Sequence, residues 1–302
     1  MIKLNGYKFE THEIVTEDGY KSLAFRIPPK IHDNRKEKQP IVLDHGIQYN
    51  IHTTAAFVLV NAGYDVWLVN QRDSGYTTHV KYKMSDFKFW ANSLDTVATK
   101  GISAILNTVA TATNKSGSII YIGHSRGATL AFMYASEYPE EAQKILTGVV
   151  ALALIIYFEP VFYVKLLFQL SPVLSLNVPL SLMQVQQYAR MFHSGKFQKY
   201  DYVKKGSILK YYQEQLPLYN LTNCKLPVYM FYGTCDIFIK EKAVKKVFKE
   251  LGCSEKEYFR IPSGTNTKKL KFGHNDYLFA KDIEELFYRN LLRVLDKLQP
   301  KK

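Results

Sequence analysis

Cysteines are scarce and widely spaced. Cys224, Cys235 and Cys253 include no Cys-x-x-Cys pair. This spacing predicts neither a zinc site nor a disulfide framework, although it permits one disulfide bridge with one thiol left over. We therefore expect no bound metal.

Long hydrophobic runs are also missing: the very apolar residues 146–158 end at Glu159, too soon for a helix to span a bilayer. A buried central strand is the better interpretation, and we expect no transmembrane segment.

The sequence has no block of basic residues, no internal repeat and no interdomain linker, although its formal net charge is +13. The lysines are scattered along the chain, so we expect no nucleic-acid partner. A lipid surface or an acidic substrate remains compatible with the charge. Residues 1–6 contain no apolar core of a signal peptide, which leaves the compartment open.

The composition is that of an ordinary globular protein. The chain has 302 residues, 47% of them hydrophobic and 22% charged, enough for one large α/β domain. Apolar and polar side chains alternate over residues 7–27, on both sides of Glu17-Asp18-Gly19, and this pattern predicts a hairpin. Short apolar strands then alternate with helical patterns, which favours a mostly parallel sheet. Strands are predicted at 41–43, 64–70, 119–122, 146–158, 227–233 and 258–261, and helices near 54–62, 87–113, 126–138, 184–194, 240–251 and 281–298.

The most informative stretch is Gly123-His124-Ser125-Arg126-Gly127, which has the pattern Gly-x-Ser-x-Gly. An apolar run precedes it, and apolar residues at helical spacing follow it. A strand that turns abruptly into a helix holds the central serine in a strained conformation and needs glycine on both sides. We predict a nucleophile elbow with Ser125 as the nucleophile and the Arg126 N–H as an oxyanion donor. An ordinary glycine-rich turn is the alternative.

A second strand end, Asp44-His45-Gly46-Ile47, lies upstream of this elbow. α/β-Hydrolases place their other oxyanion donor after the corresponding strand, and the backbone N–H of Ile47 is the candidate. A plain strand-ending turn explains this stretch equally well.

A serine hydroxyl needs an imidazole to take its proton, and the imidazole needs a carboxylate to fix its tautomer. In the chain order Ser, acid, His, with both partners on loops after late strands, the arrangement that fits is Ser125, Asp236 and His274. Asp201 and Asp282 are possible decoys for the acid, but neither directly follows a predicted core strand.

Together these residues resemble the acid lipase family of α/β-hydrolases, the gastric and lysosomal acid lipases and their relatives. The similarity extends over nearly the whole chain. It rests on Gly6-Tyr7, Thr16-Glu17-Asp18-Gly19-Tyr20, Arg26-Ile27-Pro28, His45-Gly46, residues 62–67, Phe89-Trp90-Ala91, Gly123-His124-Ser125, residues 194–201, Tyr219-Asn220-Leu221-Thr222 and His274-Asn275-Asp276-Tyr277.

The resemblance implies an α/β-hydrolase fold: a mostly parallel central sheet with helices on both faces and a short helical cap. We expect a core of residues 1–159 and 219–302, interrupted by a cap or lid insertion at 160–218. The resemblance further implies hydrolysis of acyl lipid esters, such as acylglycerols or sterol esters, through a serine acyl-enzyme and without a cofactor. It also implies a secreted or lysosomal location. Transient contact with a lipid surface is compatible with the net charge.

The sequence departs from the family pattern in three places. Arg126 stands where the family usually has glutamine, which puts a charge beside the site. Residues 160–200 make a much shorter lid than the family has. The apolar residues 160–184 are interpreted as part of a cap over an apolar pocket, or alternatively as a core or membrane segment. The loop before His274 is longer and more basic. These departures keep two alternatives open: a catalytically weak or inactive lipid-binding protein on a hydrolase scaffold, and an acyltransferase or amide-cleaving enzyme that uses the same residues.

Overall fold

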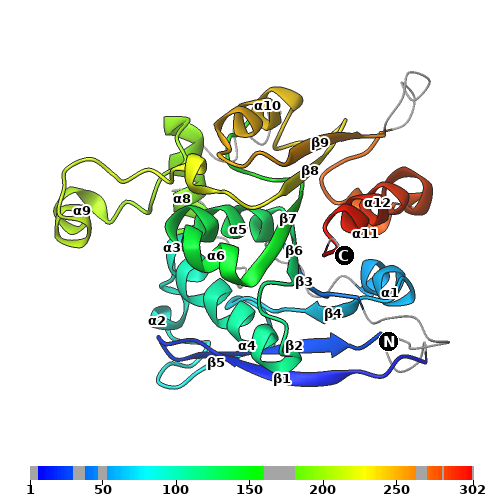
Figure 1. Cartoon of the computed structure of the whole chain (residues 1–302). Helices are drawn as coiled ribbons and strands as arrows, with labels where there is room; N and C mark the ends of the chain where they lie inside the picture. Colours follow the sequence, from blue (N-terminus) through cyan, green and yellow to red (C-terminus); the bar gives the residue numbers. More distant parts are fainter. Residues whose placement is uncertain are drawn as a thin grey trace.

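One mostly parallel sheet of nine strands organises the part of the chain that the structure describes (Figure 1). This computed structural model describes residues 6–29, 38–46, 53–159, 181–262, 271–280 and 282–300. Eight strands follow the order β1-β2-β4-β3-β6-β7-β8-β9, and β5 pairs with β2. The strands are β1 (Glu10–Val15), β2 (Tyr20–Ile27), β3 (Pro40–Asp44), β4 (Asp65–Leu68), β5 (Thr77–His79), β6 (Ile119–His124), β7 (Leu146–Leu152), β8 (Val228–Gly233) and β9 (Lys256–Ile261).

The predicted N-terminal hairpin is confirmed. β1 and β2 pair antiparallel from Glu10 opposite Arg26 to Val15 opposite Lys21, with the turn at residues 16–19. β2 also pairs antiparallel with β4, whereas β4, β3, β6, β7, β8 and β9 run parallel to one another. The carboxyl ends of the parallel strands therefore meet at one edge, where ligand sites of open α/β sheets form.

Two layers of helices cover the sheet. Alternate residues of β6 explain why both layers are needed: Ile119 and Tyr121 belong to one apolar core, and Ile120 and Ile122 belong to the other. On one face lie α3 (Leu94–Thr96), the π-helical segment η2 (Val97–Ile102), α4 (Ser103–Thr113), α5 (Arg126–Glu137), α6 (Pro139–Ile145) and α10 (Glu241–Glu250). On the other face lie α1 (Thr53–Asn61), the π-helical segment η5 (Glu284–Tyr288) and α12 (Arg289–Lys297), with α11 (Asp276–Phe279) beside them (Figure 1).

The continuous helix predicted over 87–113 is wrong in one respect. The structure has α2 (Phe87–Trp90), then a break at residues 91–93, then α3, η2 and α4. Asn92 Nδ2 donates to the Phe89 carbonyl, and Ser93 Oγ accepts from Thr96 N–H and caps the second helix. Short polar side chains that bond to the local backbone favour such breaks, although the apolar periodicity continues across this one.

The segment 181–218 packs against this layer rather than joining the sheet. It contains α8 (Leu182–Ser194) and α9 (Val203–Tyr211), and the 3₁₀ turn η3 (Leu221–Asn223) follows. Figure 1 shows α9 projecting from the body. The first part of the expected insertion, residues 160–180, lies outside the described residues. Among the described helices, none is long and apolar enough to cross a membrane.

Candidate active site

Ser125 occupies a strained turn between β6 and α5, as the Gly-x-Ser-x-Gly pattern predicts. Its φ is 53° and its ψ is −112°. A Cβ on Gly123 would lie 2.5 Å from Ala128 N, and one on Gly127 would lie 2.7 Å from the Asp44 carbonyl oxygen. Both contacts are too short for any side chain, so the close approach of β6, α5 and the end of β3 requires glycine. The turn brings Ser125 to the carboxyl-terminal edge of the sheet.

The structure brings Ser125, His274 and Asp236 into one hydrogen-bonded row. His274 Nε2 lies 2.8 Å from Ser125 Oγ, and His274 Nδ1 lies 2.8 Å from Asp236 Oδ2. A neutral imidazole protonated on Nδ1 fits both contacts, because it donates to the carboxylate and accepts from the hydroxyl. The Asp236 side chain is fully buried, and that of His274 is 7% exposed.

The residues around His274 fix its position. Asp236 follows β8, and its Oδ1 accepts from the backbone N–H groups of Phe238, at 2.8 Å, and Ile239, at 3.3 Å. The Phe238 ring packs edge-on against the imidazole, with 4.7 Å between ring centres. His124 Nε2 lies 2.8 Å from the His274 carbonyl oxygen and donates to it. The orientation of the imidazole is therefore fixed both through its carboxylate partner and through its own backbone.

The turn after β3 lies beside the serine. A Cβ on Gly46 would be 3.2 Å from Ser125 Cβ and 3.6 Å from Ser125 Oγ. The expected oxyanion donor Ile47 lies outside the described residues. The other expected donor, the Arg126 N–H, lies in the first turn of α5, where N–H groups have no partner within the helix and the helix dipole is positive.

Several ionisable groups lie buried directly behind Ser125. Tyr121 Oη and Gln71 Nε2 both donate to Asp44 Oδ2, the latter at 2.7 Å. Burial raises the pKa of Asp44, although the neighbouring His45 and Arg126 oppose this shift. Burial lowers the pKa of His45, although the charge of Asp44 opposes this shift. The lowered pKa favours the neutral form of His45, whose Nδ1 lies 2.7 Å from the Gly46 carbonyl oxygen and donates to it.

The charge on Arg126 is inside the protein rather than on an open face beside the site. Its side chain is fully buried and forms an ion pair with Asp73, in the loop after β4. Nothing in the sequence marks Asp73 as the partner of Arg126. A buried arginine on the apolar helix α5 requires a buried acid, but no spacing distinguishes Asp73 from the other acidic residues in the chain.

The decoy residues stay apart from this row. Asp201 forms an ion pair with Arg190, with 2.8 Å between Oδ2 and Nη2, and its Oδ1 accepts from the Val203 N–H over 3.0 Å. Asp282 is exposed. All three cysteines are free thiols, so the bridge that the sequence left open is not formed.

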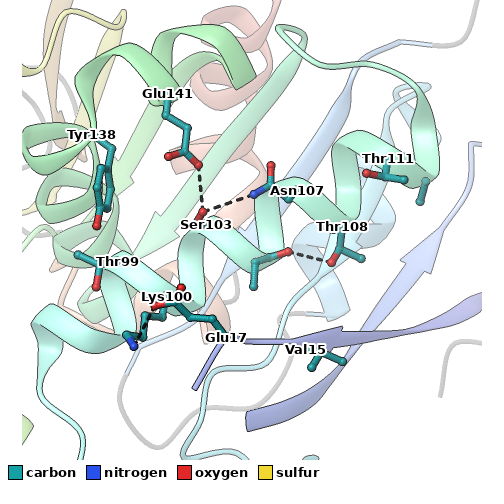
Figure 2. Close-up of a pocket in the computed structure, with 12 residues that line it drawn as sticks. Val15, Glu17, Thr99, Lys100, Ser103, Asn107, Thr108, Thr111, Tyr138 and Glu141 are labelled. Carbon is teal, nitrogen blue, oxygen red and sulfur yellow. Dashed lines mark hydrogen bonds and ion pairs between the residues drawn. The ribbon is translucent and has the colours of Figure 1, made fainter. Parts of the chain in front are cut away.

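A separate groove with a volume of about 800 Å³ lies between α4, β1 and the start of α6 (Figure 2). Its polar lining includes Ser103, which donates to Glu141 over 2.9 Å and accepts from Asn107 over 3.4 Å. None of Ser125, Asp236 and His274 lines it.

Comparison with known proteins agrees with this architecture. Residues 39–153 match the family model of the alpha/beta hydrolase fold, and residues 1–52 match that of the partial alpha/beta-hydrolase lipase region. Gastric triacylglycerol lipase of Rattus norvegicus is 26% identical over 98% of this chain and 90% of its own length. Lipase 1 of Drosophila melanogaster is 24% identical over 99% of this chain and 79% of its own length. A solved structure of a soluble variant of monoglyceride lipase from Saccharomyces cerevisiae has a TM-score of 0.61 at 14% identity, covering 98% of this chain and 96% of that one.

The fold and the matching families define the class of the protein: it is an α/β-hydrolase with a mostly parallel sheet and helices on both faces. Within that class, the chain is an acid lipase-like hydrolase and a carboxylic ester hydrolase. The resemblance drawn from the sequence is thereby confirmed.

Proposed function

We propose that this protein hydrolyses the carboxylic esters of acyl lipids, acylglycerols or sterol esters, through a covalent acyl-enzyme on Ser125. The observation that carries the proposal is the row Ser125–His274–Asp236, with 2.8 Å at each of its two contacts. The name of the similar gastric triacylglycerol lipases supports a lipid ester as the substrate.

In the first half of the reaction, His274 Nε2 takes the proton of the Ser125 hydroxyl as Oγ attacks the acyl carbonyl. Asp236 holds the imidazole in the Nδ1–H tautomer and stabilises the imidazolium that forms. The N–H groups of Arg126 and Ile47 bind the oxyanion of the tetrahedral intermediate. His274 then protonates the leaving alcohol, and the acyl group remains on Ser125.

In the second half, water attacks the acyl-enzyme while His274 accepts its proton. The collapse of the second tetrahedral intermediate releases the fatty acid and restores Ser125. All of these steps are proton transfers and acyl transfers between the named groups, so the mechanism requires no cofactor.

We further propose that residues 160–218 form a short cap over the acyl-binding region, inserted between core segments 1–159 and 219–302. The length of this cap sets how much of a bulky lipid it can cover. A shortened cap is expected to favour esters with one or two acyl chains and to make contact with lipid surfaces transient.

The test compares hydrolysis of p-nitrophenyl esters from acetate to palmitate by the wild type and by Ser125→Ala. Ser136→Ala is a matched control, because Ser136 is also a buried serine but lies near the far end of α5, about three helical turns from the elbow. The proposal predicts wild-type and control activity that rises toward long chains, and none above background in Ser125→Ala.

Retained hydrolysis by Ser125→Ala would overturn the assignment of the nucleophile. A folded wild type that binds a fatty acyl ester without turnover would favour the lipid-binding alternative. Ester products formed from an added alcohol in preference to fatty acid would favour acyl transfer.

A further inference from the structure

The residue that directly follows Ser125 has its charged side chain entirely inside the protein. The Arg126 side chain is 0% exposed, and that of its ion-pair partner Asp73 is 2% exposed. The same nitrogen, Nη1, also donates to Gln184 Oε1 over 3.0 Å. Arg126 thus connects the elbow to the loop after β4 and to helix α8.

The ion pair keeps both charges in a region that disfavours them. Burial alone would lower the pKa of Arg126, but the charge and hydrogen bond of Asp73 outweigh burial and raise it. Burial would likewise raise the pKa of Asp73, and Arg126 outweighs this effect and lowers it. Removal of one partner would leave the other charge buried without a counter-charge, which would destabilise the folded protein strongly. The two side chains are therefore held close together in the folded state.

The network extends beyond the pair. Gln184 Nε2 donates to Asn92 Oδ1 over 2.7 Å, and Ser181 Oγ donates to the Asn92 carbonyl over 2.6 Å. Asn92 lies in the break between α2 and α3, and Ser181 precedes α8. The start of α8 is therefore anchored through Asn92 and Gln184 to the residue after the serine.

This anchoring acts at a strained point of the backbone. Ser125 has a φ of 53°, a region that residues other than glycine adopt at a cost and keep only where their surroundings hold them. Gly123 and Gly127 permit this conformation, but they have no side chains that could stabilise it. The side chain of Arg126, directly after Ser125, contacts both Asp73 in the loop after β4 and Gln184 in α8.

We propose that the Arg126 side chain is a positioning residue for ester hydrolysis: its ion pair with Asp73 and its hydrogen bond to Gln184 hold the Arg126 N–H in the orientation that stabilises the oxyanion. This inference rests on the proposed function. The charge does not contact the substrate, because the Arg126 side chain is 0% exposed. Its effect therefore reaches the reaction through the backbone of the elbow.

The test uses Arg126→Gln, Asp73→Asn and the double variant, with kcat expressed per active site titrated by a phosphonate ester. A positioning role predicts that Arg126→Gln lowers kcat by about 10-fold or more while KM changes little, because a misaligned oxyanion donor loses part of the roughly 10²- to 10³-fold that its complete removal costs. The double variant leaves no unpaired charge, so it should regain most of the lost Tm but keep the low kcat. It also serves if Arg126→Gln alone does not fold.

The matched control is Arg26→Gln. Arg26 pairs with the buried Asp65 over 2.9 Å between β2 and β4, away from the elbow. We expect it to lower Tm and to leave kcat per titrated site unchanged. The positioning role would be overturned if Arg126→Gln had the same kcat per titrated site as the wild type, or if the double variant fully recovered the wild-type kcat. Neither result would affect the proposed function, which Ser125→Ala tests separately.

Discussion

Ser125 Oγ and His274 Nε2 lie 2.8 Å apart, although 149 residues separate them in the chain. β6 carries the serine to the edge of the sheet, and the stretch before α11 brings the histidine to the same edge. Because β8 ends nearby, Asp236 completes the row. The parallel topology of the sheet, rather than any local motif, accounts for the meeting of these three residues.

Asp236→Asn tests the role of the carboxylate. An amide can present its NH₂ group to Nδ1 and stabilise the wrong tautomer, so we expect kcat to fall by about 10⁴-fold while KM stays within a few-fold. Asp282→Asn, at the exposed decoy, should leave kcat unchanged. Steady-state kinetics on a soluble short-chain ester measures both, and an unchanged kcat in Asp236→Asn would contradict the role.

Gly127→Ala tests the packing of the elbow. The new Cβ would lie 2.7 Å from the Asp44 carbonyl oxygen, and backbone on both sides must move to admit it. Such overpacking costs about 1–3 kcal/mol, and we expect the upper end together with loss of activity. Gly75→Ala is the control, since its Cβ would have nothing within 4 Å. Equal Tm values for the two variants would show that the elbow tolerates the side chain.

His124→Phe tests the hydrogen bond from His124 Nε2 to the His274 carbonyl. Loss of this bond lets the backbone of His274 shift, and small misplacements of a catalytic group lower kcat by about 10- to 100-fold. The control is His79→Phe, because His79 Nε2 also donates to a backbone carbonyl, that of Asp18, over 2.9 Å. Identical kcat values for both variants would argue against a supporting role of His124.

The Arg126–Asp73 pair predicts a specific dependence of stability on pH. The pKa of Asp73 in the folded protein lies below its usual value of 3.8. At a pH between these two pKa values, the unfolded chain binds more protons at Asp73 than the folded protein does. The stabilisation that ionised Asp73 gives the folded protein is therefore complete above pH 3.8 and is lost as pH falls through the lowered pKa. The Tm difference between the wild type and Asp73→Asn should therefore shrink on acidification from about pH 6 to about pH 3. A difference that stays constant over this range would contradict the prediction.

Much of the fold was predictable because its signals are local. The hairpin at Asp18-Gly19, the short buried strands and the switch from strand to helix at Ser125 all depend on neighbouring residues. The break at Asn92-Ser93 was missed because apolar periodicity continues across it. β5 was missed because Thr77–His79 is short and polar and pairs with β2 only in the folded sheet.

The site was predictable to a different extent. Chain order and strand ends were enough to select Ser125, Asp236 and His274, which the structure brings together. The partners of Arg126 were not predictable, because Asp73 and Gln184 lie 53 and 58 residues away along the chain and no motif marks either of them. Long-range pairs of this kind depend on the packing of complete elements.

Covalent labelling with a fluorophosphonate, followed by mass spectrometry of the digested protein, shows directly whether Ser125 is an activated nucleophile. The reagent reacts with serines that an adjacent base activates, so we expect one adduct per molecule, located on Ser125. Labelling should be lost in Ser125→Ala and retained in Ser136→Ala. An adduct on another residue, or no adduct on folded wild-type protein, would contradict the claim that Ser125 is an activated nucleophile.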